Sequence, residues 1–155
     1  MTSEMLEVLR QYPFVEEFHP EHIDRLTMLA SEVRFEPGQV IFREGDECSL
    51  FFVILSGSIA LEADLAGRTF RVQTLYPGDE LGWSAVLNHK KEFRARALEE
   101  VSAMSFEASR LWQAVKDDPC FGCAFFYRMF TVVARRLQGT RYQLMAALAE
   151  AGPPK

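Results

Sequence analysis

The stretch that decides the fold runs from residue 37 to residue 61 and reads PGQVIFREGDECSLFFVILSGSIAL. Runs of β-branched and aromatic residues alternate in it with three turn-forming pairs, Pro37-Gly38, Gly45-Asp46 and Ser56-Gly57. β-Branched and aromatic side chains favour strands, whereas glycine and proline favour the tight turns between them. The stretch therefore predicts three short strands in close succession.

The same alternation continues on both sides of this stretch. We expect strands at residues 33–35, 40–43, 50–55, 59–63, 70–76, 94–98 and 101–106. Further turns fall at Ala66-Gly67 and Pro77-Gly78. Seven or eight short strands with such regular turns indicate a sandwich or jelly roll rather than a parallel sheet. We therefore predict a mostly β fold with flanking helices, in which a double-stranded β-helix, or jelly roll, occupies residues 32–108.

Length and composition fit one folded domain. The chain has 155 residues, of which 48% are hydrophobic and 25% charged, and its net charge is −5. Such a chain buries a full core without disulfide bonds, and its acidic balance argues against a broad nucleic-acid-binding surface. We predict a single domain over residues 1–155. Apolar residues at helical spacing predict helices at 3–11 and 21–31, which form a helical lead-in over residues 1–31.

The N-terminus and the cysteines indicate the compartment. The first ten residues, MTSEMLEVLR, are acidic where a signal peptide is positively charged, and no apolar run approaches the ~20 residues of a membrane span. The three cysteines, Cys48, Cys120 and Cys123, lack the spacing of a disulfide scaffold. We therefore expect a cytoplasmic protein that does not associate with a membrane.

Two helices are expected after the strands, over residues 109–150, and a tail follows at 151–155. The first, short helix should start at Ser109 or Arg110. The second, long helix has a clear start signal. Asp118 suits the N-cap, and Pro119 suits the first helical position, where its missing N–H costs nothing.

The long helix carries two apolar stripes. The first has the 4, 3, 4, 3 spacing of a coiled-coil seam and comprises Phe126, Phe130, Val133, Leu137, Thr140, Leu144 and Ala147. The second comprises Phe121, Phe125, Met129 and Val132. One stripe suffices to cover the jelly roll while the seam meets a copy of itself, which predicts a two-fold homodimer. The alternative is that the jelly roll and the N-terminal helices absorb both stripes.

The stretch from residue 77 to residue 98, PGDELGWSAVLNHKKEFRARAL, is the candidate site. Its Gly-Trp-Ser step comes where a short helix can begin, with Ser84 as N-cap, and a cationic loop at 88–91 follows. Free backbone N–H groups at a helix start, facing a basic loop, make a plausible anion cradle. A surface loop with solvated lysines accounts for the same residues, so both interpretations stay open.

Other chemistries find less support in the residues. A metal-dependent jelly-roll enzyme needs two or three histidines inside the barrel, but only His89 lies in the strand region. We expect no metal and no catalytic residues. Cys120 and Cys123 have C-x-x-C spacing at a helix start, where the helix dipole lowers a thiol pKa, so a thiol redox sensor is a further alternative to simple packing.

Three segments of the chain resemble a known family. They are residues 37–61, residues 77–83 (PGDELGW) and residues 134–141 (ARRLQGTR). Together with the order of helices, jelly roll and long helix, they resemble the cyclic-nucleotide-binding domain of the catabolite activator and Fnr-type bacterial regulators. The resemblance covers nearly the whole chain, from about Leu6 to Leu148. It implies a non-enzymatic small-molecule sensing domain whose ligand is cyclic AMP, cyclic GMP or another small anion.

The resemblance also implies a ligand site, with two departures from the family's pattern. In the family, a glycine-glutamate segment holds the ribose, and an arginine followed by small residues neutralises the cyclic phosphate. Here Gly82 keeps the glycine position, Trp83 replaces the glutamate, and Lys91 replaces the arginine, with Glu92 and Phe93 at the small positions. A lysine acts as a point charge rather than a planar fork, so we do not expect tight binding of cyclic AMP or cyclic GMP.

Further candidates come from the neighbouring residues and from the long helix. Arg94 reaches the pocket if the loop register shifts, and Thr140 and Arg141 match positions that reach the base in the family's dimer. Thr140 has an alternative role in fixing the register of the seam. The candidate ligand residues are Gly82, Trp83, Ser84, Ala85, Lys91, Glu92, Phe93, Arg94, Thr140 and Arg141.

The end of the chain bears on the partner. The family's regulators continue into a helix-turn-helix domain, whereas this sequence ends at Lys155. We therefore expect no direct DNA binding, a homodimer through the long helix, and a protein effector as partner. The alternative function is a ligand-free dimeric interaction module, in which Trp83 and Phe93 fill the pocket.

Overall fold

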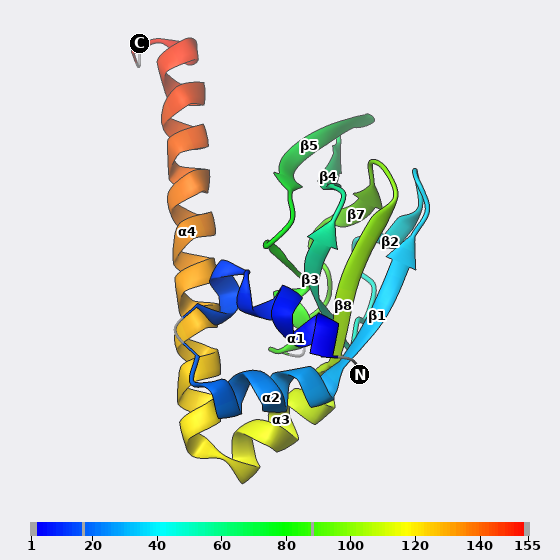
Figure 1. Ribbon diagram of the computed structural model, residues 1–155. Helices are drawn as coiled ribbons and strands as arrows, with labels where there is room; N and C mark the ends of the chain where they lie inside the picture. The colour runs from blue at the N-terminus through cyan, green and yellow to red at the C-terminus, as the bar shows by residue number, and fades with distance from the viewer. Residues whose placement is uncertain (1–2, 17, 88, 154–155) are drawn as a thin grey trace.

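Two four-stranded antiparallel sheets face each other in the computed structural model, which describes residues 3–16, 18–87 and 89–153 (Figure 1). The first sheet has the strand order β1 (Ala30–Phe35), β8 (Val101–Glu107), β3 (Leu50–Ser56), β6 (Glu80–Leu81). The second has the order β2 (Val40–Phe42), β7 (Arg94–Ala97), β4 (Ile59–Leu65), β5 (Arg68–Leu75). The predicted mostly β jelly roll with flanking helices is confirmed.

Six of the seven expected strands begin and end within two residues of the expected bounds, and two larger differences concern β1 and β6. Strand β1 begins at Ala30, because Ala30 already pairs with Phe106 of β8, so the sheet starts two residues earlier than residue 32. Strand β6 was not predicted. It has only two residues, and it exists because Phe52 and Val53 of β3 pair with Leu81 and Glu80 across the fold.

Alternating side chains of both sheets fill the space between them. This inner core contains Phe35, Phe42, Phe52, Ile54, Ile59, Leu61, Leu75, Leu81, Ala95, Ala97, Val101 and Ala103. Alanines on β7 and phenylalanines on β2 and β3 interdigitate across the layer, as facing sheets require. The inner core ends near Leu61 and Leu81, which also line a cavity described below.

The helices cover the outer face of the first sheet. They are α1 (Ser3–Arg10), the short 3₁₀ helix η1 (Pro13–Val15), α2 (Pro20–Leu29), α3 (Ala108–Asp117) and the beginning of α4 (Pro119–Ala151). Figure 1 shows α1, α2 and α3 between the lower half of α4 and the strands. Phe51 and Phe106 of the sheet pack with Phe14, Phe121 and Phe125 of the helical segments, which joins the two layers into a second core.

Helix α4 begins as the sequence predicts. The Asp118 carboxylate accepts hydrogen bonds from the backbone N–H groups of Cys120 and Phe121, both at 3.1 Å, and Pro119 occupies the first helical position. The preceding helix, α3, starts at Ala108, one residue before the expected start. No helix among the described residues combines the length and the apolar character that a membrane span needs.

The two stripes of α4 have different environments. Its buried residues, Phe121, Gly122, Phe125, Arg128, Met129 and Val132, all lie in the first half and belong to the second stripe or its neighbours. The seam is exposed instead. Phe130 is 72% exposed, Leu137 51% and Leu144 57%. Within one chain, the jelly roll and the N-terminal helices therefore absorb only one of the two stripes.

Candidate functional site

A cavity of about 430 Å³ lies between the jelly roll and the middle of α4. Its apolar wall consists of Phe42, Leu61, Val72, Leu81, Trp83, Phe93, Val133 and Leu137. The polar groups around it come from Gln73, Gly82, Ser84, Lys91, Glu92, Arg136, Thr140 and Gln143. Strands β2, β4, β5 and β6, the segment 82–93 and α4 therefore build one site from distant parts of the sequence.

Most of the predicted ligand residues meet at this cavity. Those that line it are Gly82, Trp83, Ser84, Lys91, Glu92, Phe93 and Thr140. The other three lie elsewhere. Ala85 borders an open groove on the far side of the segment, near Trp112 of α3. Arg94 and Arg141 are not part of the cavity lining, and Arg141 is exposed.

The turn at Gly82 shapes one side of the cavity. Gly82 has φ +88°, in the left-handed region, and it caps the 3₁₀ helix η2 (Trp83–Ala85). A Cβ at this position would lie 2.8 Å from the carbonyl oxygen of Leu50, so only glycine fits. The expectation that Ser84 is the N-cap is wrong: Ser84 lies inside η2, and a glycine turn rather than a side-chain cap starts the helix.

Lys91 is the buried cation of the cavity. It is 3% exposed, and its Nζ donates hydrogen bonds to Ser84 Oγ at 2.7 Å and to the carbonyl oxygen of Gly82 at 3.4 Å. The same Nζ lies 4.8 Å from the centroid of the Phe42 ring. Burial lowers the pKa of Lys91, because the ammonium loses water, while the nearby Cys48 thiol opposes the shift.

Trp83 and Phe93 line the cavity but do not fill it. Both side chains are half-buried. Trp83 packs against the second core, which joins the helices to the first sheet, and Phe93 packs against the inner core. The space between them remains open at about 430 Å³. The pocket that the ligand-free alternative requires to be filled is therefore open in this structure.

Arg94 belongs to an ion-pair network on the outer face of the second sheet. Its Nη1 lies 3.0 Å from Asp64 Oδ2, and its Nε lies 3.4 Å from Glu62 Oε1. Arg96 Nη2 binds the other oxygen of Glu62 at 2.8 Å. The hydrogen bond from Arg96 is the main reason that the pKa of Glu62 is lowered. The strand register that pairs Arg94 with Glu62 gives Arg94 this outward direction, so Arg94 does not line the cavity in this structure.

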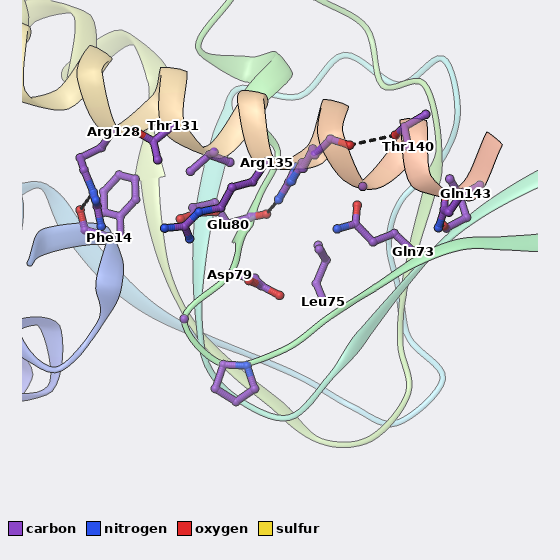
Figure 2. A pocket seen from close by; sticks show the side chains of 16 residues that line it. Phe14, Gln73, Leu75, Asp79, Glu80, Arg128, Thr131, Arg135, Thr140 and Gln143 are labelled. Carbon is purple, nitrogen blue, oxygen red and sulfur yellow. Dashed lines mark hydrogen bonds between the residues drawn. The ribbon is translucent and has the colours of Figure 1, made fainter. Parts of the chain in front are cut away.

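A second, smaller cavity of about 260 Å³ adjoins the first between α4 and the Pro77–Asp79 turn (Figure 2). Figure 2 shows Arg128 directed at Phe14, whose carbonyl oxygen accepts a hydrogen bond from Arg128 Nε at 2.7 Å. Arg136 lines both cavities and donates through Nη2 to the carbonyl oxygen of Glu80. Burial raises the pKa of the Glu80 carboxyl, and Arg136 partly offsets this rise.

Sequence reasoning missed the wall that α4 and β5 contribute. Val133, Arg136, Leu137 and Gln143 come from α4, and Gln143 Nε2 also donates to the carbonyl oxygen of Val72 on β5 at 3.2 Å. One signal was present, because Arg136 and Thr140 are four residues apart and so share a helix face. The redox candidates Cys120 and Cys123 are both exposed and unbridged at the start of α4. Among the described residues, no group of three metal-binding side chains is assembled.

The comparisons agree with this architecture. Residues 32–118 match the cyclic nucleotide-binding domain family. A cyclic nucleotide-binding domain from Methylobacillus flagellatus KT superposes with a TM-score of 0.83 at 16% identity, covering 94% of this chain and 83% of that one. The N-terminal domain of a transcriptional regulator from Streptomyces coelicolor A3(2) gives 0.71 at 24% identity, covering 88% and 94%.

A third solved structure adds the catabolite activators to this set. The Thermus thermophilus Catabolite Activator Protein superposes with a TM-score of 0.73 at 20% identity, covering 87% of this chain and 62% of that one. Comparison with curated proteins gives no match. The fold and the resemblance predicted from the sequence are confirmed by the family match and the solved structures together.

Proposed function

The chain belongs to the cyclic nucleotide-binding domain family, and from this premise we propose that it is a non-enzymatic sensing domain that binds a small anionic ligand between the jelly roll and α4. One observation carries the proposal: the open cavity at this place holds a buried cation, Lys91, together with the residues of the altered ligand motif. Its volume of about 430 Å³ falls in the range of roughly 300–1,000 Å³ that is typical of small-molecule pockets.

Each lining residue has a proposed role. Lys91 supplies the positive charge, Gly82 and Ser84 orient its ammonium, and Trp83 and Phe93 provide flat apolar contacts. Thr140 of α4 closes the site from the other side; its hydroxyl donates to the Arg136 carbonyl oxygen at 2.9 Å, so it offers the ligand an acceptor oxygen. Cyclic AMP and cyclic GMP are the first candidates because of the family. The altered motif predicts that they bind weakly.

The output is proposed to pass through α4. Val133 and Leu137 belong both to the cavity wall and to the exposed seam. A ligand that contacts them therefore also changes the free energy with which the seam binds a partner. A second copy of the chain is the proposed occupant of the seam, and a protein effector is the proposed receiver of the signal. The three free cysteines are consistent with action in the cytoplasm.

A ligand-free dimeric interaction module is the second candidate function. The observation in its favour is the exposed apolar seam, which includes Phe130 at 72% exposure. Such a face calls for a partner whether or not a small molecule binds. The open cavity favours the sensing domain over this alternative.

Isothermal titration with cyclic AMP and cyclic GMP tests the proposed function. We expect weak, saturable heat for the wild type, with Kd above about 10 μM, that disappears in Lys91→Ala. The matched control is Lys90→Ala, which removes the same charge from an exposed neighbour. Absence of binding by either nucleotide, and by every member of a small-anion library in thermal-shift assays, would contradict a sensing role and leave the interaction module.

A further inference from the structure

The wall of the larger cavity indicates what kind of ligand body fits it. The apolar side chains that face the cavity include Phe42, Leu61, Leu81, Trp83, Phe93 and Leu137. Trp83 occupies the position at which, by the resemblance to the family, a glutamate would bind the sugar hydroxyls. A hydroxyl pressed against an indole or a phenyl ring loses its hydrogen bonds to water and gains none. The wall therefore disfavours a sugar and favours an aromatic or aliphatic body.

The charges around the cavity indicate where an acid group would bind. Among the described residues, no carboxylate lies within ion-pair distance of Lys91 Nζ. Its neighbours are the Ser84 hydroxyl, the Gly82 carbonyl, the Phe42 ring and the Cys48 thiol. Glu92 lines the cavity but is exposed, and it forms no ion pair with any residue that the structure describes. Lys91 is therefore a buried cation without a carboxylate partner among the described residues, an arrangement that an incoming anion would relieve.

Arg136, the other cation of the wall, has carboxylates near it, although burial still lowers its pKa overall. Its guanidinium donates to the carbonyl oxygen of Glu80 and lies in the field of the Glu80 and Asp79 carboxylates. Those acids line the smaller cavity and not the larger one. Of the two cations of the larger cavity, Lys91 is thus the one without a nearby carboxylate.

We propose that the larger cavity takes an organic acid with a mostly apolar body, whose acid group lies against Lys91 and whose body lies between Trp83, Phe93 and α4. This inference rests on the proposed function and narrows its ligand class. A single charged head and an apolar body match one buried cation and an aromatic wall, whereas a cyclic nucleotide brings a polar ribose and a polar base to the same space.

A matched pair of fluorescent probes tests this class. 1-Anilinonaphthalene-8-sulfonate carries the acid group, and N-phenyl-1-naphthylamine has nearly the same aromatic body without it. We expect the sulfonate to bind the wild type at one site per chain, at least about tenfold more tightly than the neutral amine, because only the sulfonate pairs with Lys91. Because we expect cyclic AMP to bind the same site with a Kd above about 10 μM, about 1 μM cyclic AMP should not displace the sulfonate.

Matched variants locate the effect. Lys91→Met keeps the length and apolar bulk of the side chain, and we expect about a tenfold loss of sulfonate affinity with less than about a twofold change for the neutral amine. Lys90→Met removes an exposed charge next to it and should change neither. Lys91→Arg keeps the charge and should retain the preference for the sulfonate. If Lys91→Met does not fold, the wild-type preference and the Lys91→Arg result decide the question.

The contrary outcomes separate this inference from the proposed function. If about 1 μM cyclic AMP displaces the sulfonate and its binding depends on Lys91, the sensing role stands and the apolar-acid class is wrong. If both probes bind equally, or if Lys91→Met leaves the sulfonate affinity unchanged, Lys91 does not hold the acid group and the inference is overturned. If neither probe nor any cyclic nucleotide binds, both the ligand class and the sensing role fail.

Discussion

A few residues between positions 82 and 91 determine the shape of one side of the candidate site. Gly82 makes the left-handed turn that lets η2 follow β6 directly, and Lys91 reaches back to the same turn through Ser84. Neither contact is visible in the local sequence, which placed the cap on Ser84 instead. The resemblance did identify both residues, because it compares positions rather than hydrogen bonds. Mutations at Gly82 and at Lys91 should therefore not be additive in their effects on stability and ligand binding.

We expect Gly82→Ala to lower the free energy of unfolding by about 2 kcal/mol or more, because it adds a strained positive φ and a Cβ only 2.8 Å from the Leu50 carbonyl oxygen. Urea unfolding measures the change. Gly38→Ala is the control, since Gly38 has φ +81° but no atom within 4 Å of a Cβ, and it should cost about 1 kcal/mol. Equal losses in both variants would refute the close approach at Gly82.

Glu62 should make the stability of the protein depend on pH. Its pKa is lowered in the folded state, mainly by the hydrogen bond from Arg96, so its stabilisation is present above the ordinary glutamate pKa of about 4.3. This stabilisation is lost as the pH falls through the lowered value. Glu62→Gln should therefore cost about 1 kcal/mol at pH 7, and this cost should shrink as the pH falls through the lowered pKa of Glu62, with the exposed Glu47→Gln as control. A cost that is independent of pH would show that Glu62 acts through packing rather than charge.

Some helices and strands could be predicted from their own residues, and others depend on contacts with distant parts of the chain. The start of α4 was predictable, because Asp118 and Pro119 act on their own first turn. The strands with β-branched runs were predictable for the same reason. Strand β6 and the cavity wall were not, since β6 depends on pairing with β3 and the wall depends on α4 crossing β5. The register of β4 and β7 also sets the direction of the Arg94 side chain, which the loop sequence alone does not determine.

The N-cap of α4 gives a prediction for this element. Asp118→Ala should lower the free energy of unfolding by about 1 kcal/mol, because two backbone N–H groups lose their acceptor. Asp118→Asn keeps a capping oxygen and should recover most of the loss. Thermal unfolding of the two variants measures the difference, and an asparagine variant as unstable as the alanine variant would assign the effect to the 3.7 Å ion pair with Arg25 instead.

The seam of α4 gives the prediction for assembly. Leu144→Glu should convert a dimer to a monomer in sedimentation experiments, because it buries a charge in the apolar interface that we propose. Ala149→Glu adds the same charge to an exposed position outside the seam and should leave the dimer intact. A wild type that is monomeric at high concentration, or a Leu144→Glu variant that stays dimeric, would contradict dimerisation through this face.

At the scale of the whole molecule, the candidate site belongs to neither layer alone. The jelly roll supplies the cation and the aromatic wall, and α4 supplies Val133, Leu137 and Thr140. The buried part of α4 holds the helix on the body, and three residues of its seam, Val133, Leu137 and Thr140, also line the cavity. A ligand in this position contacts both the jelly roll and α4. We therefore expect a bound small molecule to change the position or the exposure of the seam of α4.

Hydrogen–deuterium exchange with and without ligand tests this central claim most directly. With saturating 1-anilinonaphthalene-8-sulfonate, and in parallel with cyclic AMP, the ligand that binds should slow exchange in two separate segments, residues 81–87 with 91–93 and residues 133–143 of α4. Leu144→Glu controls for probe molecules that bind the exposed seam. Slower exchange on both sides of the cavity is the predicted result. Protection confined to residues 144–151, or to one side only, would contradict a ligand site shared by the jelly roll and α4.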